Sequence, residues 1–262
     1  MPKSDVLIYE KECNGRVVIL TMNRPKRMNA LNTEMSSALK NAWERFRDDE
    51  EAWVAILTGA GDAFCAGRDL KEDSHNQETK NLWNTPWITR PSLSEFLSLW
   101  KPTIAAINGY AIAAGWIMAQ NCDIRLAAED TKMGIAEVKW NMPAGPVYQL
   151  TRQLHLQHAI EIVLWGGRWI TAQRAYEIGW VNRVVPGERL MSEAMKWAKQ
   201  MIELAPRDVQ NLKEILYRSY YMGSVEGAAF ATAVEKNLVG MEDSVEGRCA
   251  FIENRKPHFR NK

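Results

Sequence analysis

The sequence predicts an α/β fold in which a parallel sheet comes first and a series of helices follows. Short apolar segments of strand length alternate with a helical pattern over the first half of the chain. The order strand, helix, strand is typical of a parallel crossover. From Val147 onward the pattern is helical almost to the C-terminus. An α/β core therefore precedes a helical tail.

The first strands and helix are marked by turn and cap signals. Val6–Glu10 and Val17–Met22 flank Asn14-Gly15, so we expect a hairpin there. A helix is expected from Thr33, as its cap, to about Arg47, because apolar residues recur on one stripe. Val54–Thr58 then reads as a buried strand that lies parallel to the second hairpin strand.

The middle of the chain contains a second strand, turn and helix. Thr103–Ile107 has the β-branched, apolar character of a buried strand, and Ala111–Cys122 has the length and composition of a buried helix. Ile124–Ala127 and Thr131–Trp140 are expected to be extended, and the sheet is expected to finish near Gly145. These elements complete the predicted sheet.

Six helices are predicted in the remainder of the chain. Thr171 and Ser244 suit the first residues of two of them. The predicted helices span residues 155–164, 171–178, 188–203, 207–220, 225–238 and 244–253. Such a tail is suited to making subunit contacts.

Composition excludes several classes of function. The 33 Lys and Arg nearly balance the 32 Asp and Glu, so no overall field favours nucleic acid or a membrane surface. No apolar run reaches the roughly 18 residues that a membrane span needs, and the first residues lack a secretory signal. We therefore expect a cytoplasmic protein without metal or disulfides, because the cysteines are scattered: Cys13, Cys65, Cys122 and Cys249.

Two turns of small residues each follow a predicted parallel strand. They are Ala66-Gly67-Arg68-Asp69 and Ala113-Ala114-Gly115. Neighbouring parallel strands end at the same edge of a sheet, where ligands bind, so one backbone N–H from each turn can converge on one oxygen. That geometry is an oxyanion hole, in which one donor is typically worth about 3 kcal/mol in the transition state. The alternative is that small residues only allow close packing.

Further motifs run in order along nearly the whole chain. They are Asn-Arg-Pro…Asn-Ala-Leu (23–31), Phe-Cys-Ala-Gly-Arg-Asp-Leu (64–70), Lys-Pro-Thr-Ile-Ala-Ala-Ile-Asn-Gly-Tyr-Ala (101–111), Cys-Asp-Ile (122–124) and Glu-Gly-Arg…Phe-Ile-Glu-Asn-Arg-Lys-Pro (246–257). Together they resemble the crotonase family, also called enoyl-CoA hydratase/isomerase.

The resemblance implies a fold, an assembly and a substrate. The fold is a spiral of ββα units, with residues 1–190 as the α/β core holding an acyl-CoA site and residues 191–262 as a helical region that builds homotrimers or hexamers. The substrate is an unsaturated acyl-CoA thioester, and no other cofactor is implied. By position, the amides of Arg68 and Ala114 bind the thioester oxygen as it becomes an enolate.

The resemblance also implies an acid–base residue and shows a departure. Hydratases of the family use two glutamates, of which the second corresponds to Glu137. The first corresponds to Ile117, which carries no proton. A single carboxylate suits an enoyl-CoA isomerase, or a hydratase-lyase similar to the hydroxycinnamoyl-CoA enzymes, whose Glu, Trp, Pro and Gly match residues 137–145. A second departure is the Ala113-Ala114 pair in place of glycines. Alanine tolerates helical φ and ψ, so we expect the amide of Ala114 still to point into the site.

The remaining candidate residues would contact substrate. Four cations are candidates for the CoA phosphates, with the last reaching a neighbouring subunit: Lys26, Arg27, Lys71 and Lys256. Other expected substrate-binding residues are Ala66, Gly67, Asp69, Leu70, Gly115, Ile117 and Trp140. A set of tryptophans expected near the acyl site favours a flat or cyclic acyl group: Trp83, Trp87, Trp100, Trp116 and Trp140. The competing function is a degenerate member that binds acyl-CoA or RNA without turnover.

Overall fold

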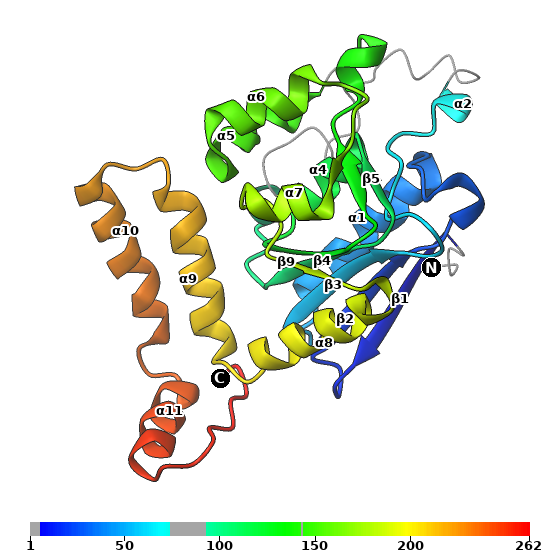
Figure 1. Cartoon of the computed structure of the whole chain (residues 1–262). Coiled ribbons are helices and arrows are strands. Elements are labelled where there is room, and N and C mark those ends of the chain that lie inside the picture. The colour runs from blue at the N-terminus through cyan, green and yellow to red at the C-terminus, as the bar shows by residue number, and fades with distance from the viewer. Residues whose placement is uncertain (1–5, 74–92, 143) are drawn as a thin grey trace.

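The main sheet of the protein has six strands and is parallel except at one edge. The computed structural model describes residues 6–73, 93–142 and 144–262 (Figure 1). The sheet order is β1-β2-β3-β4-β6-β9, in which β1 and β2 are antiparallel and every later pair is parallel. The strands are β1 (Leu7–Glu12), β2 (Val17–Met22), β3 (Val54–Gly59), β4 (Thr103–Ile107), β6 (Ile124–Ala128) and β9 (Arg183–Val185).

A second, smaller sheet lies beyond the carboxyl ends of the main strands. It contains β5 (Tyr110–Ile112), β7 (Lys132–Gly134) and β8 (Ile170–Thr171), in that order. A strand of the main sheet is followed at once by a strand of the second sheet and then by a helix, as in β4, β5 and α4 (Ala114–Gln120). This order confirms the expected α/β spiral of ββα units.

Alternate side chains of the central strands enter two hydrophobic cores. On one face, Ala55 and Leu57 pack in the same cluster as residues of α1 (Thr33–Asp48). On the other face, Ile56 and Ile104 pack with α8 (Leu190–Met201). Shorter helices connect the strands: α2 (Leu70–Asp73), α3 (Leu93–Leu97), α5 (Leu150–Gln153), α6 (Leu156–Leu164) and α7 (Ala172–Glu177).

Three helices extend away from the sheet at the C-terminus. They are α9 (Pro206–Ser219), α10 (Ser224–Glu235) and α11 (Glu242–Ile252), and α9 lies beside α10 (Figure 1). The sequence placed the boundary of this region after residue 190. The helix that follows this boundary, α8, packs on the sheet, and the division of the chain at residue 190 stays a prediction.

The first elements match the sequence predictions closely. The hairpin and β2 lie where they were expected, and β2 and β3 are parallel. The cap of α1 is Asn32, whose side chain accepts a hydrogen bond from the N–H of Met35, and not Thr33. An asparagine directly before a threonine offers two adequate caps, and the chain uses the earlier one.

Four later predictions were wrong. The segment Thr131–Trp140 is extended only at Lys132–Gly134, and Glu137–Trp140 is a 3₁₀ helix. Ala111–Cys122 is not one helix, because β5 ends at Ile112 and Ala113 turns the chain before α4. The sheet does not finish near Gly145, since β9 adds a strand from the segment between two predicted helices. Ser244 does not begin α11, whose cap is Met241; the Ser244 hydroxyl donates to the Leu238 carbonyl instead. Within the described parts of the chain, no helix is long and apolar enough to cross a bilayer.

Candidate active site

The first turn is held by a short parallel bridge between Leu31 and Arg68. The N–H of Leu31 donates to the Gly67 carbonyl at 2.7 Å, and the N–H of Asp69 donates to the Leu31 carbonyl at 2.9 Å. In such a bridge the residues on either side of Arg68 make the contacts with Leu31. The N–H of Arg68 is therefore directed to the opposite side of the turn.

The second turn has a strained backbone. Ala113 has φ 54° and ψ −122°, a region that glycine adopts far more easily than alanine. The prediction that this pair would have helical φ and ψ was therefore wrong for Ala113. Ala114 is the first residue of α4, so its N–H has no acceptor within its own helix. Strain of this kind costs about 1–3 kcal/mol and is concentrated at functional sites.

Contacts between the two turns leave no room for larger residues. A Cβ added to Gly115 would lie 2.1 Å from the Cys65 carbonyl oxygen. A Cβ added to Gly67 would lie 3.0 Å from the Cβ of Ala113 and 3.5 Å from the nitrogen of Ala114. The two turns thus meet, as the sequence predicted, and bring the backbones of residues 67–68 and 113–114 together.

Cys65 connects the two turns through its backbone. Its N–H donates to the Tyr110 carbonyl, and its carbonyl accepts from the N–H of Ile112, both at 2.9 Å. Burial raises the pKa of the Cys65 thiol to about 12, so no thiolate forms near neutral pH. The sulfur lies 3.3 Å from the Gly67 nitrogen, whose N–H points to it. Cys65 is thus a packing residue.

Glu137 follows the strand that runs beside the second turn. The N–H of Ala113 donates to the Gly134 carbonyl at 2.8 Å, and the 3₁₀ helix Glu137–Trp140 begins shortly after. The side chain is buried, and its Oε2 accepts a hydrogen bond from the N–H of Ala136 at 3.0 Å. Burial raises the pKa of Glu137 above its ordinary value, although backbone hydrogen bonds oppose the shift.

Four other positions that the sequence offered for a second proton-transfer group, all of them among the described residues, do not supply one. Ile117 is buried in the core. Glu129 and Asp130 are exposed in the turn between β6 and β7. Asp123 accepts hydrogen bonds from Thr103 and Tyr217 and pairs with Lys213 at 2.8 Å. It lies at the amino end of the strands, away from the turns.

Three of the four candidate phosphate-binding cations border the first turn. Lys26 and Arg27 are exposed on a 3₁₀ helix whose neighbour Met28 accepts a hydrogen bond from the N–H of Ala66 at 3.0 Å. Lys71 is exposed on α2, directly after the turn, and Leu70 beside it is 45% exposed. Ala66 is partly exposed at the same place. Asp69, in contrast, is buried and paired with Arg24.

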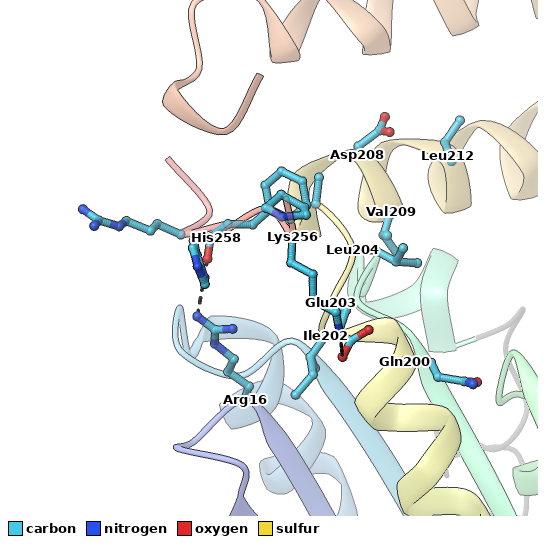
Figure 2. Close-up of a pocket in the computed structure, with 14 residues that line it drawn as sticks. Arg16, Gln200, Ile202, Glu203, Leu204, Asp208, Val209, Leu212, Lys256 and His258 are labelled. Carbon is cyan, nitrogen blue, oxygen red and sulfur yellow. Dashed lines mark hydrogen bonds and ion pairs between the residues drawn. The ribbon is translucent and has the colours of Figure 1, made fainter. Parts of the chain in front are cut away.

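Lys256 lies at the other edge of the sheet. It lines a cavity of about 840 Å³ between the end of α8, the start of α9 and the C-terminal tail, and its Nζ is 3.5 Å from Glu203 (Figure 2). Arg16, which precedes β2, lines the same cavity and donates to the Phe259 carbonyl (Figure 2). Because the two turns follow the carboxyl ends of the strands, Lys256 does not reach them within one subunit.

The tryptophans expected around the acyl site have different surroundings. Trp116 stacks on Trp180 with ring centroids 3.7 Å apart, and both are fully buried, so Trp116 is a core residue. Trp100 lies beside Tyr217 of α9. Trp140 is 61% exposed at the end of the 3₁₀ helix that begins at Glu137. The expectations for Trp83 and Trp87 fall outside the described residues.

Sequence reasoning missed two residues that hold the first turn. Arg24 pairs with Asp69, and Asn29 donates from Nδ2 to the carbonyls of Ala60 and Ala63. Both lie in the Asn-Arg-Pro…Asn-Ala-Leu motif, which was recognisable as a motif but gave no indication of partners. Among the described residues, no group of three or more His, Cys, Asp or Glu is placed to hold a metal ion.

Comparisons with known proteins agree with this geometry. A sequence model described as enoyl-CoA hydratase/isomerase matches residues 12–262. The chain is 35% identical over 260 residues to a probable mitochondrial enoyl-CoA hydratase of Dictyostelium discoideum, covering 96% of this chain and 90% of that protein. It is 34% identical over 252 residues to the (E)-benzylidenesuccinyl-CoA hydratase of Thauera aromatica, covering 95% and 97%.

Solved structures extend the likeness to three dimensions. The crystal structure of an enoyl-CoA hydratase from Bacillus anthracis superposes with a TM-score of 0.90 at 29% identity, covering 98% of this chain and all of that one. Sequence and fold therefore agree over nearly the whole length. The chain belongs to the enoyl-CoA hydratase/isomerase family, the crotonase family.

Proposed function

We propose that this enzyme adds water reversibly to the α,β double bond of an acyl-CoA thioester. The observation that carries the proposal is the meeting of the two turns, which brings the backbone at Arg68 and at Ala114 to one place. Both N–H groups then donate to the thioester oxygen. Donors held in place in this way stabilise the negative charge that the oxygen acquires in the enolate.

Glu137 is the proposed acid–base group for both proton transfers. Its carboxylate takes a proton from water while the water oxygen bonds to Cβ, and the double-bond electrons move to the thioester oxygen. The carboxyl group then returns that proton to Cα as the enolate collapses. A raised pKa suits a group that must both accept and donate near neutral pH.

Isomerisation of a 3-enoyl to a 2-enoyl thioester is a second candidate, favoured by Ile117. The family position of a second glutamate holds a buried isoleucine, and one carboxylate suffices to move a proton from Cα to Cγ. In that reaction Glu137 removes the α proton, the enolate forms in the same hole, and Glu137 protonates Cγ. The two reactions share every residue proposed here.

Substrate and assembly follow from the surroundings of the site. Lys26, Arg27 and Lys71 border the first turn and are proposed to meet the CoA phosphates, with no further cofactor. The exposed Trp140 and the aromatic acyl group named for the Thauera relative favour a flat or cyclic acyl chain. Exposed apolar side chains on the extension support a trimer or hexamer in which a neighbour supplies Lys256: Leu216, Val225, Phe251 and Ile252. We also expect the assembly in the cytoplasm.

The test is product analysis by mass spectrometry on linear, cyclic and aromatic 2- and 3-enoyl-CoAs. A product heavier by one water supports hydration, an isomer of unchanged mass supports isomerisation, and a shortened thioester with a released aldehyde indicates hydration with cleavage. Glu137→Gln should lower the rate at least about 100-fold, whereas Glu129→Gln, an exposed control, should not. Absence of turnover by the wild type would leave a binding-only protein.

A further inference from the structure

A buried ion pair lies directly behind the first turn. Arg24, in the loop after β2, donates from Nη2 to Oδ2 of Asp69 at 3.0 Å. The two side chains are only 15% and 10% exposed. The second guanidinium nitrogen of Arg24 donates to the carbonyl of Ala30. One planar side chain therefore ties the residue after Arg68 to the loop that carries Leu31.

The loop that carries Arg24 is itself fixed. The N–H of Arg24 donates to Oδ1 of Asn29 at 2.8 Å, and the N–H of Asn29 donates to the Arg24 carbonyl at 3.0 Å. Asn29 is fully buried, and its Nδ2 reaches the carbonyls of Ala60 and Ala63, which precede the first turn. Asn29 thus connects the backbone of Arg24 to the residues that precede the first turn.

The peptide that needs holding is the one between Gly67 and Arg68. Gly67 has φ 94°, a conformation that only a residue without a side chain adopts easily. On that side, the peptide is held by the hydrogen bond from the Leu31 N–H to the Gly67 carbonyl at 2.7 Å and not by the dihedral preference of Gly67 itself. On the other side, Asp69 is held through its N–H by Leu31 and through its carboxylate by Arg24. Rotation of this peptide would swing the N–H of Arg68 away from a bound oxygen.

We propose that Arg24 and Asp69 are positioning residues that fix the direction of the Arg68 N–H. The inference rests on the proposed function of that N–H as an oxyanion donor. A buried ion pair contributes little net stability compared with apolar residues of similar size, so stability alone gives no reason for one here. A guanidinium that bonds two acceptors at once supplies direction, which an oxyanion donor requires.

The test replaces Arg24 and follows the bound thioester directly. Arg24→Met and Asp69→Asn should lower kcat about 10-fold to 100-fold, with KM changed less than about 3-fold, because ground-state binding does not depend on this one donor. The infrared C=O band of a bound thioester labelled at its carbonyl carbon should lose part of the red shift seen in the wild type, because the N–H of Ala114 still donates while that of Arg68 no longer does. Arg24→Lys keeps the positive charge but cannot bond both acceptors as the planar guanidinium does, so it should restore kcat only in part relative to Arg24→Met.

A second buried ion pair provides the matched control. Lys213 and Asp123 are 2.8 Å apart and similarly buried, but at the opposite edge of the sheet. Lys213→Met should destabilise the protein and leave both kcat and the carbonyl band of the folded enzyme unchanged. Hydrogen exchange of the segment 64–70 should quicken in Arg24→Met and not in Lys213→Met.

The outcomes separate the two proposals. If the wild type shifts the carbonyl band and Arg24→Met shifts it equally, the positioning role is overturned while the proposed function stands. If the wild type neither shifts the band nor turns over any thioester, the proposed function fails and this inference fails with it. If Arg24→Met is too unstable to isolate, Asp69→Asn decides, since it removes the charge with almost no change in shape.

Discussion

The two ends of strands β3 and β4 are built by different means. At the carboxyl ends, the turns consist of small residues, and backbone groups make the important contacts: Gly67 and Gly115 pack directly on other backbone. At the amino ends, long charged side chains make the contacts. There Lys101 donates to the carbonyls of Phe46 and Asp49 at 2.8 and 2.6 Å.

The amino-end network joins the helical extension to the core. Lys213 of α9 donates to the Lys101 carbonyl and pairs with Asp123, each at 2.8 Å. Tyr217 of α9 donates to the other oxygen of Asp123 at 2.9 Å. Lys101 is only 7% exposed, and this burial lowers its pKa to about 8.

The difference follows from what each end must do. The thioester-oxygen site proposed for the carboxyl end needs N–H groups that point outward, which agrees with the small side chains there and with the backbone strain at Ala113. The network that anchors α9 needs hydrogen-bonded polar groups and does not need to be accessible to a ligand. Substitutions at the two ends should therefore separate activity from stability.

The largest effect is expected for Gly115→Ala. The new methyl would lie 2.1 Å from the Cys65 carbonyl oxygen, so one of the two turns must move. We expect a loss of at least about 3 kcal/mol in the free energy of unfolding, together with loss of turnover. Urea denaturation measures the first. Gly187→Ala, where the nearest atom would be 3.9 Å away, is the control and should be nearly neutral.

Lys213→Met should affect stability alone. It leaves the carboxylate of Asp123 without its cation but with hydrogen bonds from Thr103 and Tyr217, so we expect a loss of about 2 kcal/mol. The kcat/KM of the folded enzyme should stay within about 2-fold of wild type, since no contact with the turns is removed. A large fall in kcat/KM would show that the amino-end network also controls the site.

Ala113→Gly should make the carboxyl end less strained. Glycine adopts φ 54° and ψ −122° without a steric cost, so thermal unfolding should show a gain of about 1 kcal/mol after the entropy of glycine is subtracted. If stability falls instead, the contact between the Ala113 methyl and Gly67 outweighs the strain.

The smallest effect is expected for the stability of Glu137→Gln, and it should depend on pH. Because burial raises the pKa of Glu137, the wild type is most stable below the ordinary pKa of a glutamate and loses that contribution as pH rises through the raised value. The variant should therefore gain stability relative to wild type as pH increases, although it loses activity. Paired melting curves at acidic and mildly alkaline pH measure the difference. An equal difference at all pH values would contradict a raised pKa.

The sequence by itself determined the class of fold, the family and the two turns. Apolar runs of strand length and the helical periodicity of α1 report burial, which is a local property of the pattern. The pairing of β2 with β3 followed from chain order, because connections of this kind are parallel. The motifs at 23–31, 64–70 and 101–111 then marked the loops at the carboxyl edge.

Only the tertiary structure decided how those loops are held. Residues 111–119 are small or apolar throughout, so periodicity alone did not reveal the strand β5 or the turn at Ala113. The partners of Arg24 and Lys213 lie 45 and 90 residues away in the chain, at Asp69 and Asp123. Charge pairs at such separations leave no local signal in the sequence. A lysine or arginine is expected to be exposed to water unless the fold places a carboxylate beside it and buries both.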